Sequence, residues 1–430
     1  MSTPSSPPRP ARPSWRRRLT RHALRFLLVA AVLLGPNLVF FGRWFVPDTP
    51  IPAVPAAVDP MDTAGLPPAL ASDFAAAVAA GRSRAGLPSV SAAIAWGGDV
   101  RWAGVSGFAD IERGVAATTA SRYRTGSLAK PITAVAMMRL AETGSLDLDA
   151  PLSDVLPDLP AHIAPLTARQ LASHRAGIRH YSRAPQWWMG WHENYSRRPY
   201  ASVAEGLSMF VDDPLRFAPG TGFQYSTFGY SLLARALEGA SGDDFRSLLR
   251  DAVFDPAGMT GTAVDAPGPM AGRVAFYQAQ DGRYTPAWPI DSSYKIAGGG
   301  LVSTPTDLVR FGTAVLDGPL LSAPARDAMT TRQPLADGSM NPENYALGWR
   351  IDESVRLLGP DRPVTLWHHG GAQPGAAAFL MVLPRHGLVV AAMSNSGSGR
   401  AREEVQETAY ALARLAIARD GGTMPMARAR

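Results

Sequence analysis

The stretch Gly126-Ser127-Leu128-Ala129-Lys130-Pro131 decides how the rest of the chain is interpreted. Pro131 has no amide hydrogen to donate to the carbonyl of residue 127, so a helix is expected to begin at about Ser127 and to continue to Glu142. Lys130 then lies one turn after Ser127 on the same helical face. The free amides and the positive dipole end of a helix N-terminus favour a developing oxyanion. The pattern predicts a serine nucleophile with a lysine beside it.

Lysine is rare in this sequence, which makes each lysine a candidate for chemistry that arginine cannot do. Of the 42 Lys and Arg residues, only Lys130 and Lys295 are lysine. Arginine does not lose its proton in a protein, whereas lysine can act as a base. The alternative, that both lysines are remnants of a compositional bias, stays open for each of them.

A second Ser-x-x-Lys string, Ser292-Ser293-Tyr294-Lys295, shows that this spacing alone is not specific. It leads into Ala297-Gly298-Gly299-Gly300, and three successive glycines are not expected to hold a helix. We therefore prefer Ser127 and Lys130 as the reactive pair. Lys295 is expected to have a structural role and to pair with an acidic residue beneath the site.

The composition fits a globular protein and excludes several kinds of site. The chain has 430 residues, of which 46% are hydrophobic, and it has no cysteine. Without cysteine there are no disulfides, zinc–thiolate sites, iron–sulfur clusters or thiol nucleophiles. No serine lies in a G-x-S-x-G string, and His192-Glu193 lacks the second histidine of a zinc-protease helix. The sequence predicts neither a metal nor an organic cofactor.

The positive charge is concentrated at the N-terminus. Residues 1–47 contain eight arginines and no acidic residue, so the net charge of +6 leaves 34 basic against 36 acidic side chains in the remainder. No basic face for nucleic acid is therefore predicted. Residues 26–46 are largely apolar and predict a transmembrane signal anchor after a basic cytoplasmic tail over 1–25. A mitochondrial presequence, which is also rich in arginine and free of acidic residues, is the alternative.

The predicted anchor sets the expected order of domains and the location of the protein. A Pro-rich linker over 47–66 follows it, then a single composite domain over 67–420 and a polar tail over 421–430. The positive-inside rule keeps the arginines in the cytoplasm. The expected location is the inner membrane, with a single span and the catalytic domain on the periplasmic or extracellular side. Whether the anchor is cleaved stays open.

Hydrophobic patterns near both ends of the domain predict an α+β fold. The expected elements are strands over 90–96, 100–104, 377–383 and 388–394 and helices over 70–80, 127–142, after Thr304 and over 402–418. Strands near both termini with helices between them indicate one antiparallel sheet that the two termini complete. We expect helices to flank this sheet and a helical subdomain to be inserted in it.

Four motifs, in this order, resemble those of the serine β-lactamase, penicillin-binding protein and esterase family of the class C type. The motifs are Gly126-Ser127-Leu128-Ala129-Lys130-Pro131, Leu171-Ala172-Ser173-His174-Arg175-Ala176-Gly177-Ile178, Phe223-Gln224-Tyr225-Ser226-Thr227-Phe228-Gly229-Tyr230 and His368-His369-Gly370-Gly371. Longer strings over 177–181, 225–230 and 293–300 are most similar to the mitochondrial serine β-lactamase-like branch found in animals. The resemblance covers about residues 67–420 and implies the β-lactamase and transpeptidase-like fold.

The resemblance also implies roles for individual residues. Ser127 would be the acylated nucleophile, and Lys130 and Tyr225 would shuttle its proton. The backbone amides of Ser127 and Gly371 would form the oxyanion hole. The substrate-binding residues would be Thr227, His368, His369 and Gly370. His174 is expected to be a structural cap or a buried donor.

Two positions, Thr227 and His369, depart from the family pattern, and His368 takes the place of the lysine in its K/H-T-G motif. Thr227 stands where asparagine usually contacts the substrate amide, His368 replaces a lysine, and His369 stands where threonine is usual. A histidine is mostly uncharged at neutral pH, so its attraction for a substrate carboxylate should be weak and should grow as the pH falls toward 6. We therefore expect slow β-lactam turnover and better activity on esters or internal peptide bonds.

The sequence thus predicts a membrane-anchored serine hydrolase that acts through an acyl-enzyme on peptide, amide or ester bonds and is peptidase-like. The alternatives are a β-lactamase or a D-Ala-D-Ala carboxypeptidase-like hydrolase of muropeptides, a carboxylesterase, and a membrane-tethered scaffold without activity. The expected partners are a small peptide, muropeptide or ester substrate and the membrane, with self-association also open. The tryptophan-rich insert over 185–200 is interpreted as a lid, a substrate-facing wall or a packing cluster.

Overall fold

The computed structural model describes residues 20, 22–31, 48–53, 66–181 and 193–419. They fall into two units, and the first contains residues 22–31, which are helical. The second unit, over 48–181 and from 194 onward, contains all the elements described below. Within the described residues, no helix combines the length and apolar character needed to cross a bilayer. Residues 32–46 of the predicted anchor and the tail over 421–430 lie outside the described residues.

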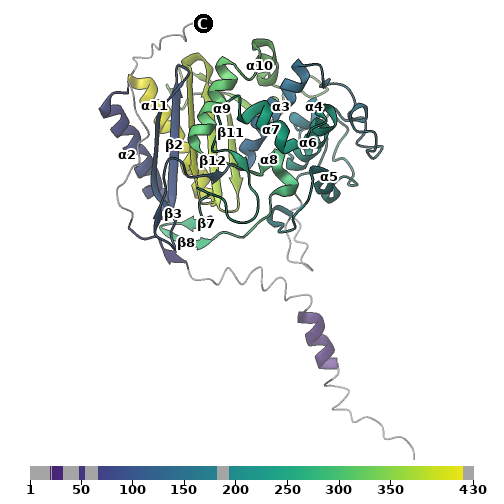
Figure 1. Cartoon of the computed structure of the whole chain (residues 1–430), viewed down its shortest axis with the longest axis horizontal. Helices are drawn as coiled ribbons and strands as arrows, with labels where there is room; N and C mark the ends of the chain where they lie inside the picture. Colours follow the sequence, from purple (N-terminus) through teal and green to yellow (C-terminus); the bar gives the residue numbers. More distant parts are fainter. Residues whose placement is uncertain (1–19, 21, 32–47, 54–65, 182–192, 420–430) are drawn as a thin grey trace, which may run out of the picture. The chain divides into compact units, whose positions relative to one another are not determined.

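A seven-stranded antiparallel sheet organises the second unit (Figure 1). Its strand order is β10-β11-β12-β13-β2-β3-β4. The strands are β2 (Ser89–Trp96), β3 (Asp99–Asp110), β4 (Val115–Ala116), β10 (Arg350–Ser354), β11 (Val364–Gln373), β12 (Ala376–Leu383) and β13 (Leu388–Ser394). Both predicted hairpins are present, and β13 pairs with β2, with Val389 opposite Ala95. The sheet is therefore completed by its two terminal hairpins, as the sequence predicts.

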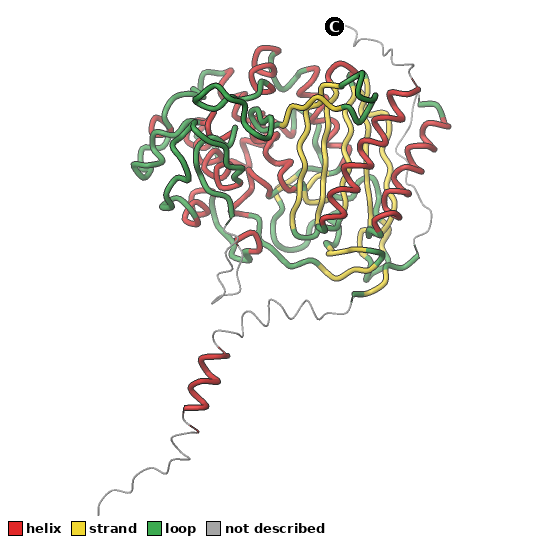
Figure 2. The backbone as a smooth tube through the Cα atoms, turned by 180° about the vertical axis from the view of Figure 1, so that it is seen from behind, coloured by secondary structure: helices red, strands yellow, loops and turns green. Residues whose placement is uncertain are grey.

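The two faces of the sheet bury different sets of side chains because successive strand residues point to opposite sides. In β12, Phe379 and Met381 belong to one hydrophobic core and Leu380 and Val382 to the other. Helices α2 (Pro68–Ala85) and α11 (Gly399–Arg419) cover the first face, and α9 (Pro305–Asp317) covers the second. Figure 1 shows α9 in front of the sheet, and Figure 2 shows two long helices across the opposite face.

Helix α9 begins as the sequence predicts. The Thr304 hydroxyl accepts a hydrogen bond from the amide of Asp307 at 3.1 Å, and Pro305 occupies the first helical position. Both features satisfy or remove amides that a helix N-terminus leaves unpaired. The Asp307 carboxylate in turn accepts a bond from Thr262 at 2.8 Å, which ties the start of α9 to the chain before it.

The predicted helical subdomain lies beside the sheet, next to α9. Its main helices are α3 (Ala129–Glu142), α4 (Ala168–Ala172), α5 (Val203–Gly206), α6 (Thr227–Ser241), α7 (Phe245–Leu249) and α10 (Ala323–Thr330). Helices α3 and α6 contribute buried apolar residues such as Val135, Met137, Leu233 and Leu237 to one core that continues onto the sheet. The two sequence motifs at the starts of these helices, around Ser127 and Tyr225, are therefore carried by a common packed core.

Two small sheets flank the main one. They are β1-β8-β7, made of Thr49–Pro50, Arg283–Pro286 and Tyr277–Gln280, and β5-β9-β6, made of Tyr123–Arg124, Leu301–Ser303 and Ala263–Val264. Thr49 lies opposite Tyr284, so the beginning of the predicted linker is paired with the domain rather than extended away from it. Ile51 packs against the small apolar cluster of Tyr277 and Tyr284, which gives this pairing a hydrophobic contact.

The expectation that residues 297–300 hold no helix is wrong. Ile296–Gly299 form a single helical turn, α8, after a 3₁₀ turn over Ser293–Lys295. Tertiary contacts compensate for the poor helix propensity of glycine, since the carbonyl of Ala297 accepts a bond from Thr133 at 2.9 Å. The glycines also allow a close approach: a Cβ at Gly298 would lie 2.5 Å from Cγ2 of Thr227.

Two adjacent glycines of β11, Gly370 and Gly371, differ in the space around them. They provide a matched test of how closely β11 packs against the backbone of Thr125. A Cβ at Gly371 would overlap the carbonyl oxygen of Thr125, whereas at Gly370 the nearest atom is Cδ2 of Phe379 at 3.9 Å. We expect Gly371→Ala to lower the free energy of unfolding by about 1–3 kcal/mol, because a backbone atom cannot give way as a side chain can. Gly370→Ala should change it by less than about 0.5 kcal/mol. Urea unfolding measures both, and equal stabilities would contradict the proposed close contact.

Candidate active site

Ser127 lies in a 3₁₀ turn, η2 (Gly126–Leu128), that leads directly into α3. The strand before it is held by a buried ion pair, Arg124 Nε to Asp265 Oδ2 at 2.7 Å. Gly126 has a φ of 52°, and a Cβ there would lie 2.5 Å from the amide nitrogen of Ala372 in β11. Glycine is therefore required at this position, and it brings the partly exposed Ser127 against the edge of the sheet.

The amino group of Lys130 is fully buried and directed at the serine. Its Nζ lies 3.2 Å from Oγ of Ser127, 3.2 Å from Oγ1 of Thr227 and 2.7 Å from the carbonyl oxygen of Gly298. Burial lowers the pKa of Lys130 well below its usual value, and the positive charges of Arg350 and Lys295 lower it further. Two partners fix the orientation of the amine, and its third position faces the serine hydroxyl. A neutral Lys130 can thus accept the proton of Ser127.

Tyr225 lies next to the same amino group. The Nζ of Lys130 lies 4.7 Å from its ring centroid, and its hydroxyl interacts with Ser127. Burial raises the pKa of Tyr225 to about 12, although Arg350 and the bond to Ser127 oppose the shift. The phenol is therefore protonated at neutral pH and is suited to donate a proton. Because both groups contact one hydroxyl, Lys130 and Tyr225 should titrate as a unit.

His174 holds the backbone on both sides of Tyr225. Its carbonyl accepts the amide of Gln224 at 2.9 Å, and its Nδ1 accepts the amide of Ser226 at 3.2 Å. His174 makes both contacts from a backbone conformation with a φ of 61°, which is uncommon outside glycine. Its ring lies 4.4 Å from the Tyr225 ring, and burial keeps its pKa well below the usual value. His174 is thus a neutral acceptor that positions Tyr225, rather than the donor that was one of the two predicted roles.

His369 faces the same group of residues and has its tautomer fixed by its neighbours. Its Nδ1 lies 2.6 Å from the carbonyl oxygen of Gly370, an acceptor, so Nδ1 carries the hydrogen. Its Nε2 then accepts from the hydroxyl of Tyr345 at 3.0 Å and from Nη1 of Arg350 at 3.3 Å. Burial lowers the pKa of His369 well below its usual value, and Arg350 and Lys130 add to the effect. His369 is therefore neutral.

His368 points to the other face of the sheet. Its Nε2 lies 2.7 Å from Oδ2 of Asp352, and its ring is 5.6 Å from that of Phe379, which belongs to the core under α2 and α11. Gly370 lies on the same side, since a Cβ there would approach Phe379. The structure therefore brings His369, but neither His368 nor Gly370, to the side of Tyr225. Adjacent strand residues alternate in direction, and the motif string alone does not say which histidine faces inward.

The remaining predicted residues lie close to the serine. Thr227 is buried, and its hydroxyl accepts a bond from Nζ of Lys130. Gly371 lies against the carbonyl of Thr125, and the next residue, Ala372, is exposed and has its amide nitrogen against Gly126. The amide of Ala372 is therefore a further candidate, beside that of Gly371, to join the Ser127 amide in an oxyanion hole. Sequence reasoning missed it because it lies one residue past the motif.

The second Ser-x-x-Lys string forms no reactive pair. Ser292 is 1% exposed and its Oγ accepts from Nε2 of Gln373 at 3.5 Å. The Nζ of Lys295 donates instead to Oδ1 of Asn194 at 3.2 Å, which is an amide oxygen and does not belong to the acidic residue that we predicted. Burial lowers the pKa of Lys295 to about 7, and Arg124 lowers it further, while Asp265 and Asp291 oppose the shift.

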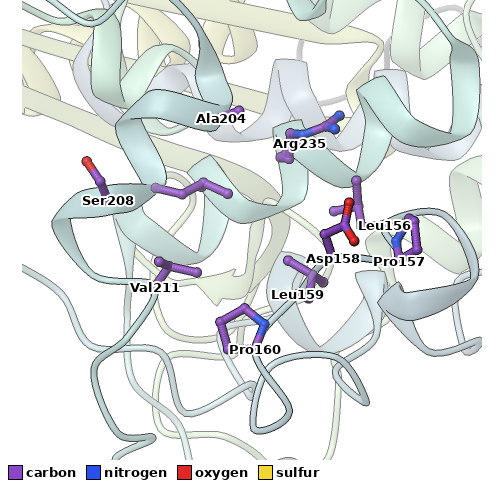
Figure 3. A pocket seen from close by; sticks show the side chains of 10 residues that line it. Leu156, Pro157, Asp158, Leu159, Pro160, Ala204, Ser208, Val211 and Arg235 are labelled. Carbon is purple, nitrogen blue, oxygen red and sulfur yellow. The ribbon is translucent and has the colours of Figure 1, made fainter.

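Other features of the described residues lie apart from this cluster. Figure 3 shows a pocket of about 390 Å³ in the helical subdomain, lined by Leu159, Val211, Asp158 and Arg235 among others, and none of the serine's partners lines it. No group of three His, Asp or Glu side chains that could hold a metal is found in the part of the chain that the structure describes. Trp187, Trp188 and Trp191 of the predicted insert lie outside that part.

The role of His174 can be tested by comparing two substitutions. His174→Ala removes the acceptor for the Ser226 amide and should slow covalent labelling of Ser127 by a fluorophosphonate on the order of 10- to 100-fold, since small displacements of a catalytic group are costly. Asn tolerates positive φ and offers an acceptor oxygen, so His174→Asn should recover part of the rate. His162→Ala, outside the site, is the control. A His174→Ala protein that is folded by circular dichroism and labels as fast as this control would contradict the positioning role.

Comparison with known proteins identifies the family of this chain. Residues 74–415 match the family model described as Beta-lactamase. The human mitochondrial serine beta-lactamase-like protein LACTB is 28% identical over 383 residues, which covers 70% of each chain. Penicillin-binding protein 4 of Amycolatopsis lactamdurans is 28% identical over 330 residues, which covers 72% of this chain and 81% of the relative. The structure of the D-amino acid amidase of Ochrobactrum anthropi SV3 superposes with a TM-score of 0.67 at 23% identity, over 82% of this chain and 99% of that one. Since the family model spans most of the sequence, the chain belongs to the beta-lactamase family of serine hydrolases.

Proposed function

We propose that this protein hydrolyses amide or ester bonds of small acyl substrates through an acyl-enzyme on Ser127. The observation that carries the proposal is the contact of Ser127 with a buried amine that also lies against Tyr225. Oγ of Ser127 lies 3.2 Å from the buried Nζ of Lys130, and this Nζ lies 4.7 Å from the ring centroid of Tyr225. A depressed lysine pKa next to a serine is the arrangement that activates a hydroxyl nucleophile.

The reaction follows from these contacts. The proton of Ser127 passes to the Lys130–Tyr225 pair as Oγ attacks the substrate carbonyl carbon. The amide of Ser127, with that of Gly371 or Ala372, stabilises the negative oxygen. The bond to the leaving nitrogen or oxygen then breaks, and the leaving group takes the proton from the pair. Water hydrolyses the acyl ester by the same proton path and restores Ser127.

Two further parts of the proposal concern substrate and location. Relatives are named as a penicillin-binding protein, an esterase and a D-amino acid amidase, which supports small peptides, muropeptides and esters as substrates. The arginines and the apolar run of the N-terminus support a membrane anchor over 26–46 that places the domain over 67–420 on the periplasmic or extracellular side. Release of the protein from membranes by alkaline carbonate, without detergent, would overturn the anchor.

The nucleophile is tested by labelling with a fluorophosphonate, in which Oγ displaces fluoride from phosphorus. Ser127→Ala should abolish the adduct, because Ser127 is partly exposed, whereas Thr227, whose hydroxyl also contacts Lys130, is buried. Ser292→Ala is the matched control and should label as the wild type does, because Ser292 is buried and lies in the other Ser-x-x-Lys string. Peptide mass spectrometry locates the adduct. An adduct on Ser292, or none on the wild-type protein, would refute the assignment, and the latter would favour the non-enzymatic scaffold.

The role of Lys130 is tested by the pH dependence of labelling. Because burial lowers its pKa, the amine stays neutral to lower pH than usual, so the rate should fall on the acid side and level off well below the ordinary lysine pKa of 10.5. Lys130→Arg keeps the charge but accepts no proton, and it should slow labelling about 100-fold or more. Lys295→Met removes the other titrating lysine, so an inflection that survives it belongs to the Lys130–Tyr225 pair. Near wild-type labelling of Lys130→Arg would show that only positive charge is needed.

A further inference from the structure

Two short segments carry the candidate oxyanion amides and lie against each other. One is residues 124–127, and the other is residues 371–375, which comprise the end of β11 and the turn after it. A Cβ at Gly126 would lie 2.5 Å from the amide nitrogen of Ala372, so the two backbones are in contact. Within the described residues, however, no backbone hydrogen bond joins these two segments. Their relative position therefore depends on side chains.

The buried side chain of Arg124 supplies a hydrogen bond between the two segments. Its Nη1 donates to the carbonyl oxygen of Pro374 at 3.1 Å, and the side chain is 8% exposed. Nε of the same guanidinium donates to Oδ2 of Asp265 at 2.7 Å, and the guanidinium carbon lies 4.0 Å from the ring centroid of Phe276. The other carboxylate oxygen of Asp265 accepts from Arg273 at 3.0 Å. These contacts fix the direction of the donor that reaches Pro374.

Pro374 and Gly375 form the two-residue turn between β11 and β12, since Gln373 and Ala376 are the last residues that pair. Proline fixes φ at a negative value, which excludes the type I′ and II′ turns that suit the twist of a hairpin. Gly375 has a φ of 76°, the value at the second central residue of a type II turn. Types I and II differ by a flip of the central peptide, and Arg124 binds the oxygen of that peptide. The bond thus stabilises a turn that strand twist alone disfavours.

We propose that Arg124 is a positioning residue for the oxyanion hole. By holding the turn after β11 against the strand before Ser127, it sets the distance between the Ser127 amide and that of Ala372 or Gly371. This inference rests on the proposed acyl-enzyme function. When Oγ bonds to the carbonyl carbon, the C=O electron pair moves onto the oxygen, and both amides have to point at that one atom. A displacement of either amide by about 1 Å slows such a reaction strongly.

Replacing the carbonyl oxygen of a substrate by sulfur reports on this geometry. Sulfur is a weak hydrogen-bond acceptor and forms a longer bond to carbon, so correctly placed amides favour the oxygen ester. The test compares 4-nitrophenyl acetate with O-(4-nitrophenyl) thionoacetate, which have the same leaving group. Release of 4-nitrophenolate during acylation is followed by absorbance, and each rate constant is divided by that for hydroxide hydrolysis of the same ester.

The normalised ratio, oxygen ester over sulfur ester, should be on the order of 100 in the wild type, the contribution of one oxyanion donor. Arg124→Met removes the bond to Pro374 and should lower the ratio about tenfold. Arg124→Lys keeps the charge beside Asp265 but replaces the fork by one nitrogen, so it should lower the ratio as well. Arg273→Met, the matched control, breaks the other ion pair of Asp265 and should keep the wild-type ratio. A loss of folded protein would slow both esters equally and leave the ratio unchanged.

The outcomes separate this inference from the function on which it rests. A wild-type ratio near one, or a ratio that Arg124→Met leaves unchanged, overturns the role of Arg124 while Ser127-dependent acylation preserves the proposed function. An equal fall in Arg273→Met also overturns it, because loss of either ion pair would then suffice. Fluorophosphonate labelling of Ser127 without acylation by the oxygen ester overturns this inference alone, and absence of both overturns both. If Arg124→Met does not fold, Arg124→Lys decides, since a wild-type ratio there refutes the role of the bond to Pro374.

Discussion

The arrangement of the site depends on one buried amino group. Nζ of Lys130 takes its acceptors from three separate segments: Ser127 at the start of its own helix, Thr227 at the start of α6 and Gly298 in α8. A buried amine without hydrogen-bond partners is costly, so these segments have to meet at one point. The same burial that makes these bonds necessary also lowers the lysine pKa and makes the amine a base. Structure and reactivity therefore have a common physical cause.

Burial affects the neighbouring groups in different ways according to their chemistry. It keeps the phenol of Tyr225 protonated and keeps His174 and His369 neutral, because each charged form would lose hydration. Arginine has no neutral form to adopt in a protein, so Arg350 retains its charge. Glu343 is its counter-ion. A site with several basic residues thus has one fixed charge, which stands beside the proton-transfer pair.

Much of this arrangement could be predicted from the sequence, and the exceptions have clear physical reasons. The hairpins and the capped helix α9 follow from local patterns, and Ser127 with Lys130 follows from helical spacing. Which of His368 and His369 faces the site does not follow from the sequence. The two residues are identical, and a shift of one residue along a strand exchanges its two faces. Arg350 reaches the site from β10, a neighbouring strand, so that only tertiary structure brings it there. The helical turn at 296–299 was missed because packing against α3 and α6 outweighs the low helix propensity of glycine.

The glycines explain how these parts approach closely enough to work together. Gly126 meets the backbone of Ala372, Gly371 meets that of Thr125, and Gly298 lies against Thr227. Each contact joins two segments at distances that a Cβ would prevent, so the nucleophile turn, the sheet edge and the wall behind Lys130 are connected through main-chain atoms. Main-chain amides are also the donors that an oxyanion needs, and they hold their positions only if the backbone carrying them is fixed. The residues that lack a side chain are therefore as strictly constrained by the reaction as those that supply one.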